Sequence, residues 1–243
     1  MLWRKFQLDW RYAFGELAIV TVGVLIALAI GQWNSERLDR ADEFDTLSRL
    51  ISDIEADLQK YDLRFRSIDE KEESLLRVQS ALSSSGPQDE IQFLNDIIVG
   101  ADFGWNQGSA KRATFDDLLE SGKIGVIADP DIRMLIVSYY VSYETEHVRI
   151  DERETAYPHL SYQIVPRGPT LKYEVGVVEA RIESGLTDAY LSERVKVAQE
   201  LSIQNHVIAE INLARFIRGV TSDLQVKAED LISSLNEYQA QIE

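Results

Sequence analysis

Two histidines stand beside carboxylates at spacings that suit a divalent metal ion. Glu144 and His147 are three residues apart in a stretch with helical periodicity, so their side chains share one helix face. His206 and Glu210 are four residues apart in a second such stretch. If these helices paired in register, two imidazoles and two carboxylates would meet at one ion. Di-metal sites in bundles repeat the Glu-x-x-His motif, which occurs once here, so histidine–carboxylate pairing on solvated faces is the simpler interpretation.

Other residue types give little support for catalysis, and we expect no cofactor. The absence of cysteine excludes disulfides, thiolate metal sites and a cysteine nucleophile. The sequence also lacks the Gly-x-Ser-x-Gly elbow of hydrolases. Tyr139, Tyr140 and Tyr143 could line an apolar pocket. Tyrosines at helical spacing pack more often in a core with the hydroxyl at its rim, so we expect a core cluster.

The charge balance argues against nucleic acid as a partner. The 243 residues include 25 Lys and Arg against 41 Asp and Glu, a formal net charge of -16. Binding a phosphate backbone requires basic residues that replace condensed counterions. Apolar residues make up 45% of the chain, which is enough to bury a core. The composition therefore predicts a folded acidic protein.

The longest apolar segment, residues 14–33, predicts a transmembrane helix. From Leu17 to Ile30 it contains no charge and only Thr21 as a polar side chain. Twenty helical residues rise about 30 Å, the thickness of the hydrocarbon core. Aromatic residues suited to the membrane interfaces accompany it: Trp3, Trp10, Tyr12 and Trp33. Residues 1–13 would form an interfacial segment, either an amphipathic helix or a basic tail with aromatic anchors.

A cleavable signal peptide is the alternative, because Ala27-Leu28-Ala29 resembles a cleavage site. We favour an uncleaved signal anchor, since the chain begins at Met1 with the segment attached. Basic residues on the two sides of the span nearly balance, so they do not decide its orientation. The residues after position 33 include 22 basic and 39 acidic ones, a net charge of -17. An inside-negative potential favours export of such a domain, which predicts a cytoplasmic N-terminus.

Four residues of the predicted span are of particular interest. Gly23, Ala27 and Gly31 repeat every four residues and form a small-residue stripe that would let two helices approach closely. Glycine and alanine are also common in membrane helices generally, so the stripe has a neutral interpretation too. Glu16 is a carboxylate one turn inside the span, which makes it a functional candidate or, more simply, an interfacial acid near basic residues.

The N-terminal part of the chain contains the stretch from Tyr12 to Glu16, then the apolar run, and then Gln32-Trp33-Asn34. This pattern resembles an uncharacterised bacterial family of single-span membrane proteins. A second block from Thr114 to Tyr140 is similar to a downstream motif of that family. Together they cover about a quarter of the chain. The resemblance implies a single N-terminal span and a helical soluble region in a bacterial inner membrane. It assigns no activity and no site residue, and Gln32 stands where Asn or a similar residue is usual. The acidic charge of the soluble region predicts that this region lies in the periplasm.

Apolar residues spaced three and four apart predict a long helix near each end of the soluble region. The first seam comprises Leu47, Ile51, Ile54, Leu58, Tyr61, Phe65 and Ile68. The second comprises Ile217, Val220, Leu224, Leu231, Leu235, Tyr238 and Ile242. The first helix would continue from the span as a stalk and end near Ser83 to Pro87. The two seams can close on each other as an antiparallel pair.

Shorter helices are predicted between these two. Thr114 and Asp117 match a capping box, and Gly122 would terminate that helix in a left-handed conformation. Asp129-Pro130 predicts the start of a further helix. The stretch from Leu171 to Val178 could be extended or helical.

These elements predict an all-α fold in which a transmembrane helix continues into a stalk and residues 34–243 form an antiparallel, acidic helical bundle. We favour a non-catalytic, membrane-anchored interaction or scaffold protein that self-associates or binds an envelope partner. Its expected partners are the lipid bilayer and a second copy or another membrane protein. A helical-bundle sensor or ligand-binding domain that works through a partner is the alternative. A metal-dependent enzyme built on His147 and His206 is the third.

Overall fold

A computed structural model gives the fold of the chain. It describes residues 10–84, 86–101, 110–166, 171–174, 177–182 and 187–242. Of the predicted interfacial segment, Trp3 lies outside the described residues, and only the backbone is described for Trp10 and Tyr12.

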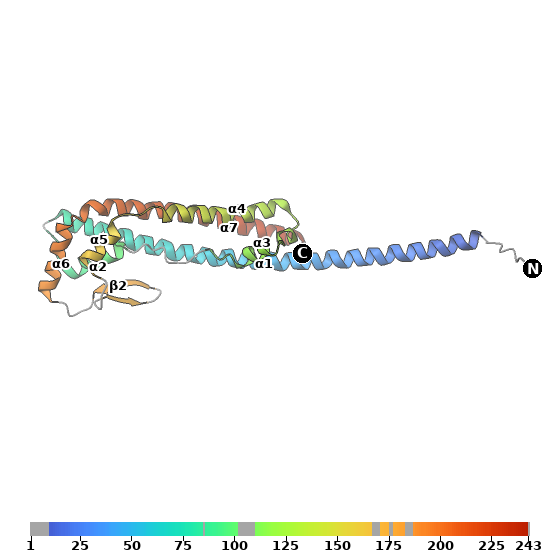
Figure 1. The fold of residues 1–243 in the computed structure, drawn as a ribbon, viewed down its shortest axis with the longest axis horizontal. Helices are drawn as coiled ribbons and strands as arrows, with labels where there is room; N and C mark the ends of the chain where they lie inside the picture. Colours follow the sequence, from blue (N-terminus) through green and yellow to red (C-terminus); the bar gives the residue numbers. More distant parts are fainter. Residues whose placement is uncertain are drawn as a thin grey trace, which may run out of the picture.

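Helix α1 runs from Trp10 to Ser83 as one element of 74 residues. At 1.5 Å per residue it is about 110 Å long. Between Gln32 and Leu82 the sequence has neither proline nor glycine, the residues that most often kink or end a helix. The apolar segment therefore continues directly into the stalk, as predicted, and projects beyond the rest of the molecule (Figure 1).

Shorter elements fill the middle of the chain: α2 (Glu90–Ala101), α3 (Ala113–Glu120), the 3-10 turn η1 (Ile124–Val126), α4 (Pro130–Asp151) and α5 (Tyr157–Ile164). Two antiparallel strands follow, β1 (Leu171–Glu174) and β2 (Val177–Ile182), with Leu171 opposite Ile182. The chain then forms α6 (Asp188–Glu200) and α7 (Gln204–Ile242). The all-α prediction is confirmed, and the segment left open between extended and helical is a short hairpin.

The main core lies between α1, α7 and α4, which run side by side along the bundle (Figure 1). Both predicted seams contribute to it: Leu47, Ile54 and Leu235 are fully buried. The C-terminal end of α7 lies beside the stalk, where Gln239 Nε2 donates to the Phe44 carbonyl at 3.1 Å. The antiparallel pairing of the two long helices is therefore confirmed.

A second apolar cluster closes the other end of the bundle, where α2 packs on the last turns of α1, and α5 and α6 pack on α2 (Figure 1). Leu75, Ile97 and Ala198 are fully buried there. On the membrane side, burial begins at Glu43, so residues 34–42 are exposed helix between the apolar span and the bundle.

The predicted N-terminal cap of α4 is confirmed, and the N-terminal capping box of α3 is wrong. The left-handed conformation predicted for Gly122 after α3 is confirmed, with φ +67°. Asp129 Oδ1 accepts hydrogen bonds from the backbone of Asp131 at 2.7 Å and Ile132 at 3.1 Å. Helix α3 begins after Arg112, and the Thr114 side chain does not cap it. Instead the Thr114 N–H donates to Asp53 of α1 at 3.2 Å. A carboxylate supplied from another helix replaces the local capping box.

Candidate functional site

Charged residues form a buried column along α1. Asp57, Arg64 and Lys71 are seven residues apart, and each is 1% exposed. Leu50 and Val78 continue the same column at either end and are also buried. The predicted seam did not include this column, because charged residues on a helix are normally solvated. Its seven-residue spacing, in phase with the apolar positions, was the signal in the sequence.

Asp57 is the centre of a hydrogen-bond network in the core. Its Oδ1 accepts from the Lys111 backbone N–H at 2.8 Å and from Lys60 Nζ at 3.2 Å. Its Oδ2 accepts from the Tyr139 hydroxyl at 3.2 Å, and that hydroxyl lies 3.1 Å from the hydroxyl of Tyr61. These contacts satisfy the buried carboxylate from α1, α4 and the segment before α3, which a structural role in the core explains.

The tyrosine cluster packs in the core, as predicted. Tyr139, Tyr140 and Tyr143 are at most 5% exposed. The Tyr140 ring stacks on Phe115 at 4.3 Å between centroids, and its hydroxyl donates to the Lys111 carbonyl at 3.3 Å. Burial raises the pKa of each of the three hydroxyls, most strongly for Tyr139. They are therefore neutral at ordinary pH and serve as hydrogen-bond groups.

The four residues considered for a metal ion have other neighbours. Glu210 is fully buried, forms an ion pair with Lys71 and accepts a hydrogen bond from Thr155. Glu144 pairs with Arg112 at 3.2 Å, and His147 lies 3.5 Å from Asp151. Within the described residues, no three His, Asp or Glu side chains are grouped so that they could hold a metal ion.

The two histidines also lie at different levels of the bundle. The end of α4 meets α7 at Phe216, where the guanidinium of Arg153 lies 3.7 Å from the ring centroid. His206 is ten residues before Phe216, a rise of about 15 Å along α7. The proposed pairing of His147 with His206 in register is therefore wrong.

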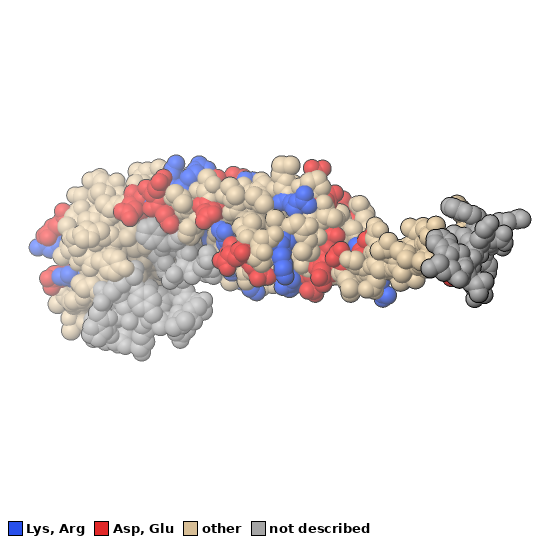
Figure 2. All heavy atoms as spheres, turned by 45° about the vertical axis from the view of Figure 1, so that its right-hand side comes forward, with Lys and Arg blue, Asp and Glu red and all other residues tan. Residues whose placement is uncertain are grey.

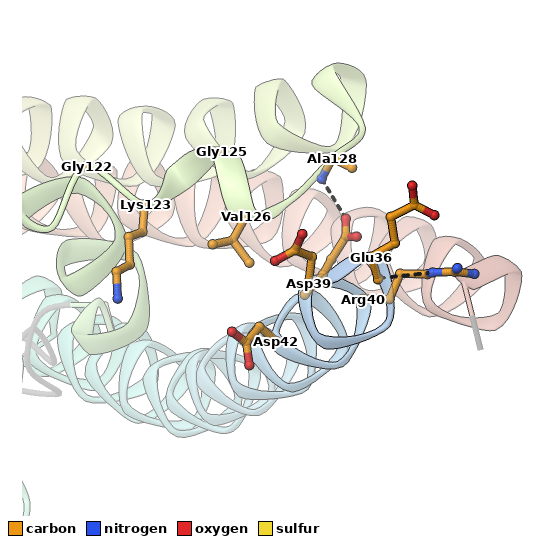
Figure 3. A pocket seen from close by; sticks show the side chains of 10 residues that line it. Glu36, Asp39, Arg40, Asp42, Gly122, Lys123, Gly125, Val126 and Ala128 are labelled. Carbon is orange, nitrogen blue, oxygen red and sulfur yellow. Dashed lines mark hydrogen bonds between the residues drawn. The ribbon is translucent and has the colours of Figure 1, made fainter. Parts of the chain in front are cut away.

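A pocket of about 690 Å³ opens at the membrane-proximal end of the bundle, between α1 and the segment that links α3 to α4 (Figure 3). Glu36, Asp39, Arg40 and Asp42 of α1 line one side, and Lys123 lies across from them. The linking segment is held in place because the Ala128 N–H donates to Glu43 Oε1 at 2.6 Å. The pocket is mainly acidic and could accept a small cationic molecule.

The part of α1 that precedes this pocket has the properties expected of a membrane span. Among the described residues, one helix is long and apolar enough to cross a membrane, and none of its apolar window is buried in the protein. The projecting apolar segment is almost uncharged, whereas acidic and basic side chains alternate over the visible face of the bundle (Figure 2). Trp33, the predicted anchor, is 59% exposed at the end of this segment.

The residues singled out within the span are exposed in the monomer. Glu16, Gly23, Ala27 and Gly31 all lie on the free helix. A side chain built at Gly23 or Gly31 would meet nothing within 4 Å. The small-residue stripe is therefore available to a second helix, and whether it binds one remains a prediction.

Comparison with known proteins does not place the chain in a family. It matches no protein-family model, and no curated protein or solved structure is significantly similar to it. The functional interpretation therefore depends on the geometry described above.

Proposed function

We propose that this protein is a non-catalytic, membrane-anchored interaction module that self-associates. The observation that carries the proposal is the continuity of α1, which joins an exposed apolar segment to the bundle without a break. A helix of this kind fixes the distance and direction of the bundle relative to the bilayer. Two copies anchored in one membrane would present the same bundle faces at the same height.

The outward face of α4 offers a surface for a second copy. Met134, Val141 and Val148 are seven residues apart and between 50% and 64% exposed, and Val137 adds a fourth apolar side chain to this face. A seven-residue repeat of this kind is the pattern by which parallel helices pair. Because α4 lies along the bundle axis, two parallel copies would bring equal positions together (Figure 1).

The charge on this stripe permits self-association in a protein of net charge -16. Its other exposed positions are Ser138 and Thr145 at the centre, with Asp131, Glu144 and Arg149 at the edges. Two of these edge charges are paired within the same molecule, Glu144 with Arg112 at 3.2 Å and Arg149 with Glu146 at 2.6 Å. Repulsion between copies would therefore be weakest on this face.

The span supports the same arrangement. Gly23, Ala27 and Gly31 form a continuous face from which no side chain larger than a methyl group projects. Close approach along such a face is a common mode of helix association in lipid. We place the protein in a bacterial inner membrane with the bundle in the periplasm, on the acidic character of the bundle and the resemblance of its N-terminal motif.

Native mass spectrometry of the full-length chain, extracted in a mild detergent, tests this proposal. We expect a discrete homo-oligomer, with a dimer as the simplest case. A strictly monomeric particle without any bound protein, at concentrations that match those in the membrane, would contradict it. The same spectrum reports bound metal, which the interaction module does not require.

The acidic pocket favours a second candidate, a ligand-binding or sensor domain that works through a partner. Its volume of about 690 Å³ falls within the range of small-molecule sites. A thermal-shift panel of small cationic compounds, including polyamines, would raise the melting temperature if this candidate is correct. The variant Asp39→Asn should reduce that shift, and a flat panel would remove the candidate.

A further inference from the structure

A second pocket, of about 550 Å³, lies where α1 leaves the bundle. It is lined by Trp33, Arg37, Arg40, Ala41, Phe44 and Ile242. The first five belong to α1 and the last to the end of α7. The pocket therefore combines apolar walls with two guanidinium groups at the point where the apolar span ends.

The spacing of these residues gathers two aromatic and two basic side chains on one face of α1. Trp33, Arg37, Arg40 and Phe44 are four, three and four residues apart, which places them on one face of the helix. The acids Asp39 and Asp42 lie on other faces and line the pocket of Figure 3, which Glu36 and Arg40 also line. Arg40 thus lies at the border between the two pockets, whereas Arg37 lines the second pocket alone.

Both arginines are available to a ligand. Arg37 and Arg40 are exposed, and neither forms an ion pair within the described part of the chain. Arg40 Nε donates to the Glu36 carbonyl at 3.4 Å, which leaves its terminal nitrogens for other acceptors. Two arginines outside any ion pair of the described residues are notable in a protein with 41 acidic residues.

The position of the arginines matches the lipid headgroup layer. Counted from Trp33, Arg37 and Arg40 are four and seven residues further along the helix, about 6 and 10 Å. The headgroup region extends roughly 5 to 8 Å beyond the hydrocarbon core. Helical side chains lean toward the helix N-terminus, which here is the side of the span. The long arginine stems therefore bring both guanidinium groups back toward the phosphates.

We propose that this pocket binds the headgroup of an anionic phospholipid from the adjacent leaflet. Arg37 and Arg40 donate charge-assisted hydrogen bonds to its phosphate. Trp33, Phe44 and Ile242 contact the glycerol and the first part of the acyl chains. This inference rests on the membrane anchoring in the proposed function, and it holds for either orientation of the span.

Lipid titrations followed by native mass spectrometry test the site on the full-length chain in detergent. The probes are phosphatidylglycerol, phosphatidylcholine and inorganic phosphate. The variant is Arg37→Gln/Arg40→Gln. Its matched control is Arg66→Gln/Lys196→Gln, which removes the same charge at two exposed positions outside the pocket. Flotation of the chain with phosphatidylcholine vesicles measures membrane anchoring independently.

We expect one phosphatidylglycerol to bind more tightly than phosphatidylcholine, and the Arg37→Gln/Arg40→Gln variant to bind it about 30-fold more weakly. The control should bind as the wild type does. Equal binding of both lipids, or an equal loss in the control, overturns the site. Competition by inorganic phosphate at similar concentration would instead assign the pocket to free phosphate. Failure to float with vesicles would overturn the membrane anchoring and this inference together, whereas flotation without lipid selectivity overturns this inference alone.

Discussion

The ion pair between Lys71 and Glu210 lies at the junction of the two apolar clusters of the bundle. The main core reaches Ile68 and Leu213 on either side of it, and the distal cluster begins at Leu75 and Ile211. Removing one partner would leave an uncompensated charge in the interior. We expect Glu210→Gln or Lys71→Met to lower the free energy of unfolding by about 3–5 kcal/mol.

A nearby exposed pair between the same helices is the control for this prediction. Arg215 and Glu72 are 2.7 Å apart, but the Arg215 side chain is 56% exposed. Glu72→Gln should cost about 1 kcal/mol or less. Urea unfolding of the variants gives the comparison, and equal losses in both pairs would show that burial does not set the energy of the Lys71 pair.

Tyr238 should make the stability of the bundle depend on alkaline pH. Burial, together with its hydrogen bond to Glu43, raises the pKa of Tyr238 from 10.0 to about 12. The pKa of Tyr238 is higher in the folded state than in the unfolded state. Its contribution to the stability of the bundle is therefore complete below pH 10 and is lost as the pH rises toward 12. The stability difference between wild type and Tyr238→Phe should therefore shrink across this interval in denaturant titrations. A constant difference would contradict the prediction.

At the scale of the elements, Gly100 sets how closely α2 approaches α1. A side chain at this position would place its Cβ 2.6 Å from Leu75 Cδ2 and 3.1 Å from the Tyr157 hydroxyl. We expect Gly100→Ala to destabilise the bundle by about 1–3 kcal/mol. Gly219→Ala is the matched control, because nothing lies within 4 Å of its added Cβ and alanine favours a helix. In thermal unfolding, the melting temperature of Gly219→Ala should equal or exceed that of the wild type.

Elements with a strong apolar period could be predicted from the sequence, including the seams of α1 and α7 and the span. The cap of α3 could not, because its acceptor, Asp53, is supplied by α1, 61 residues away from Thr114. Likewise Lys71 and Glu210 are 139 residues apart. The sequence identified Glu210 as a polar residue of interest, but its partner depends on the tertiary packing of two distant helices. Local spacing therefore led to a metal hypothesis where the fold forms an ion pair.

For the whole molecule, the surface that we propose for a second copy is distinct from the core that holds the bundle together. Val141 is 54% exposed on the outward face of α4. We expect Val141→Lys to weaken self-association while changing the free energy of unfolding by no more than about 0.5 kcal/mol. Native mass spectrometry and urea unfolding of the same preparation measure the two effects. A large loss of stability with unchanged assembly would assign Val141 to the core instead.

Disulfide cross-linking in native membranes tests the central claim most directly. The natural chain has no cysteine, so Val141→Cys introduces the sole thiol. Ile208→Cys is the control, since Ile208 is 55% exposed but lies on α7 away from the stripe. We predict efficient oxidation of Val141→Cys to a covalent dimer and little dimer from Ile208→Cys. Equal yields at both positions, or no dimer at Val141, would contradict self-association through α4.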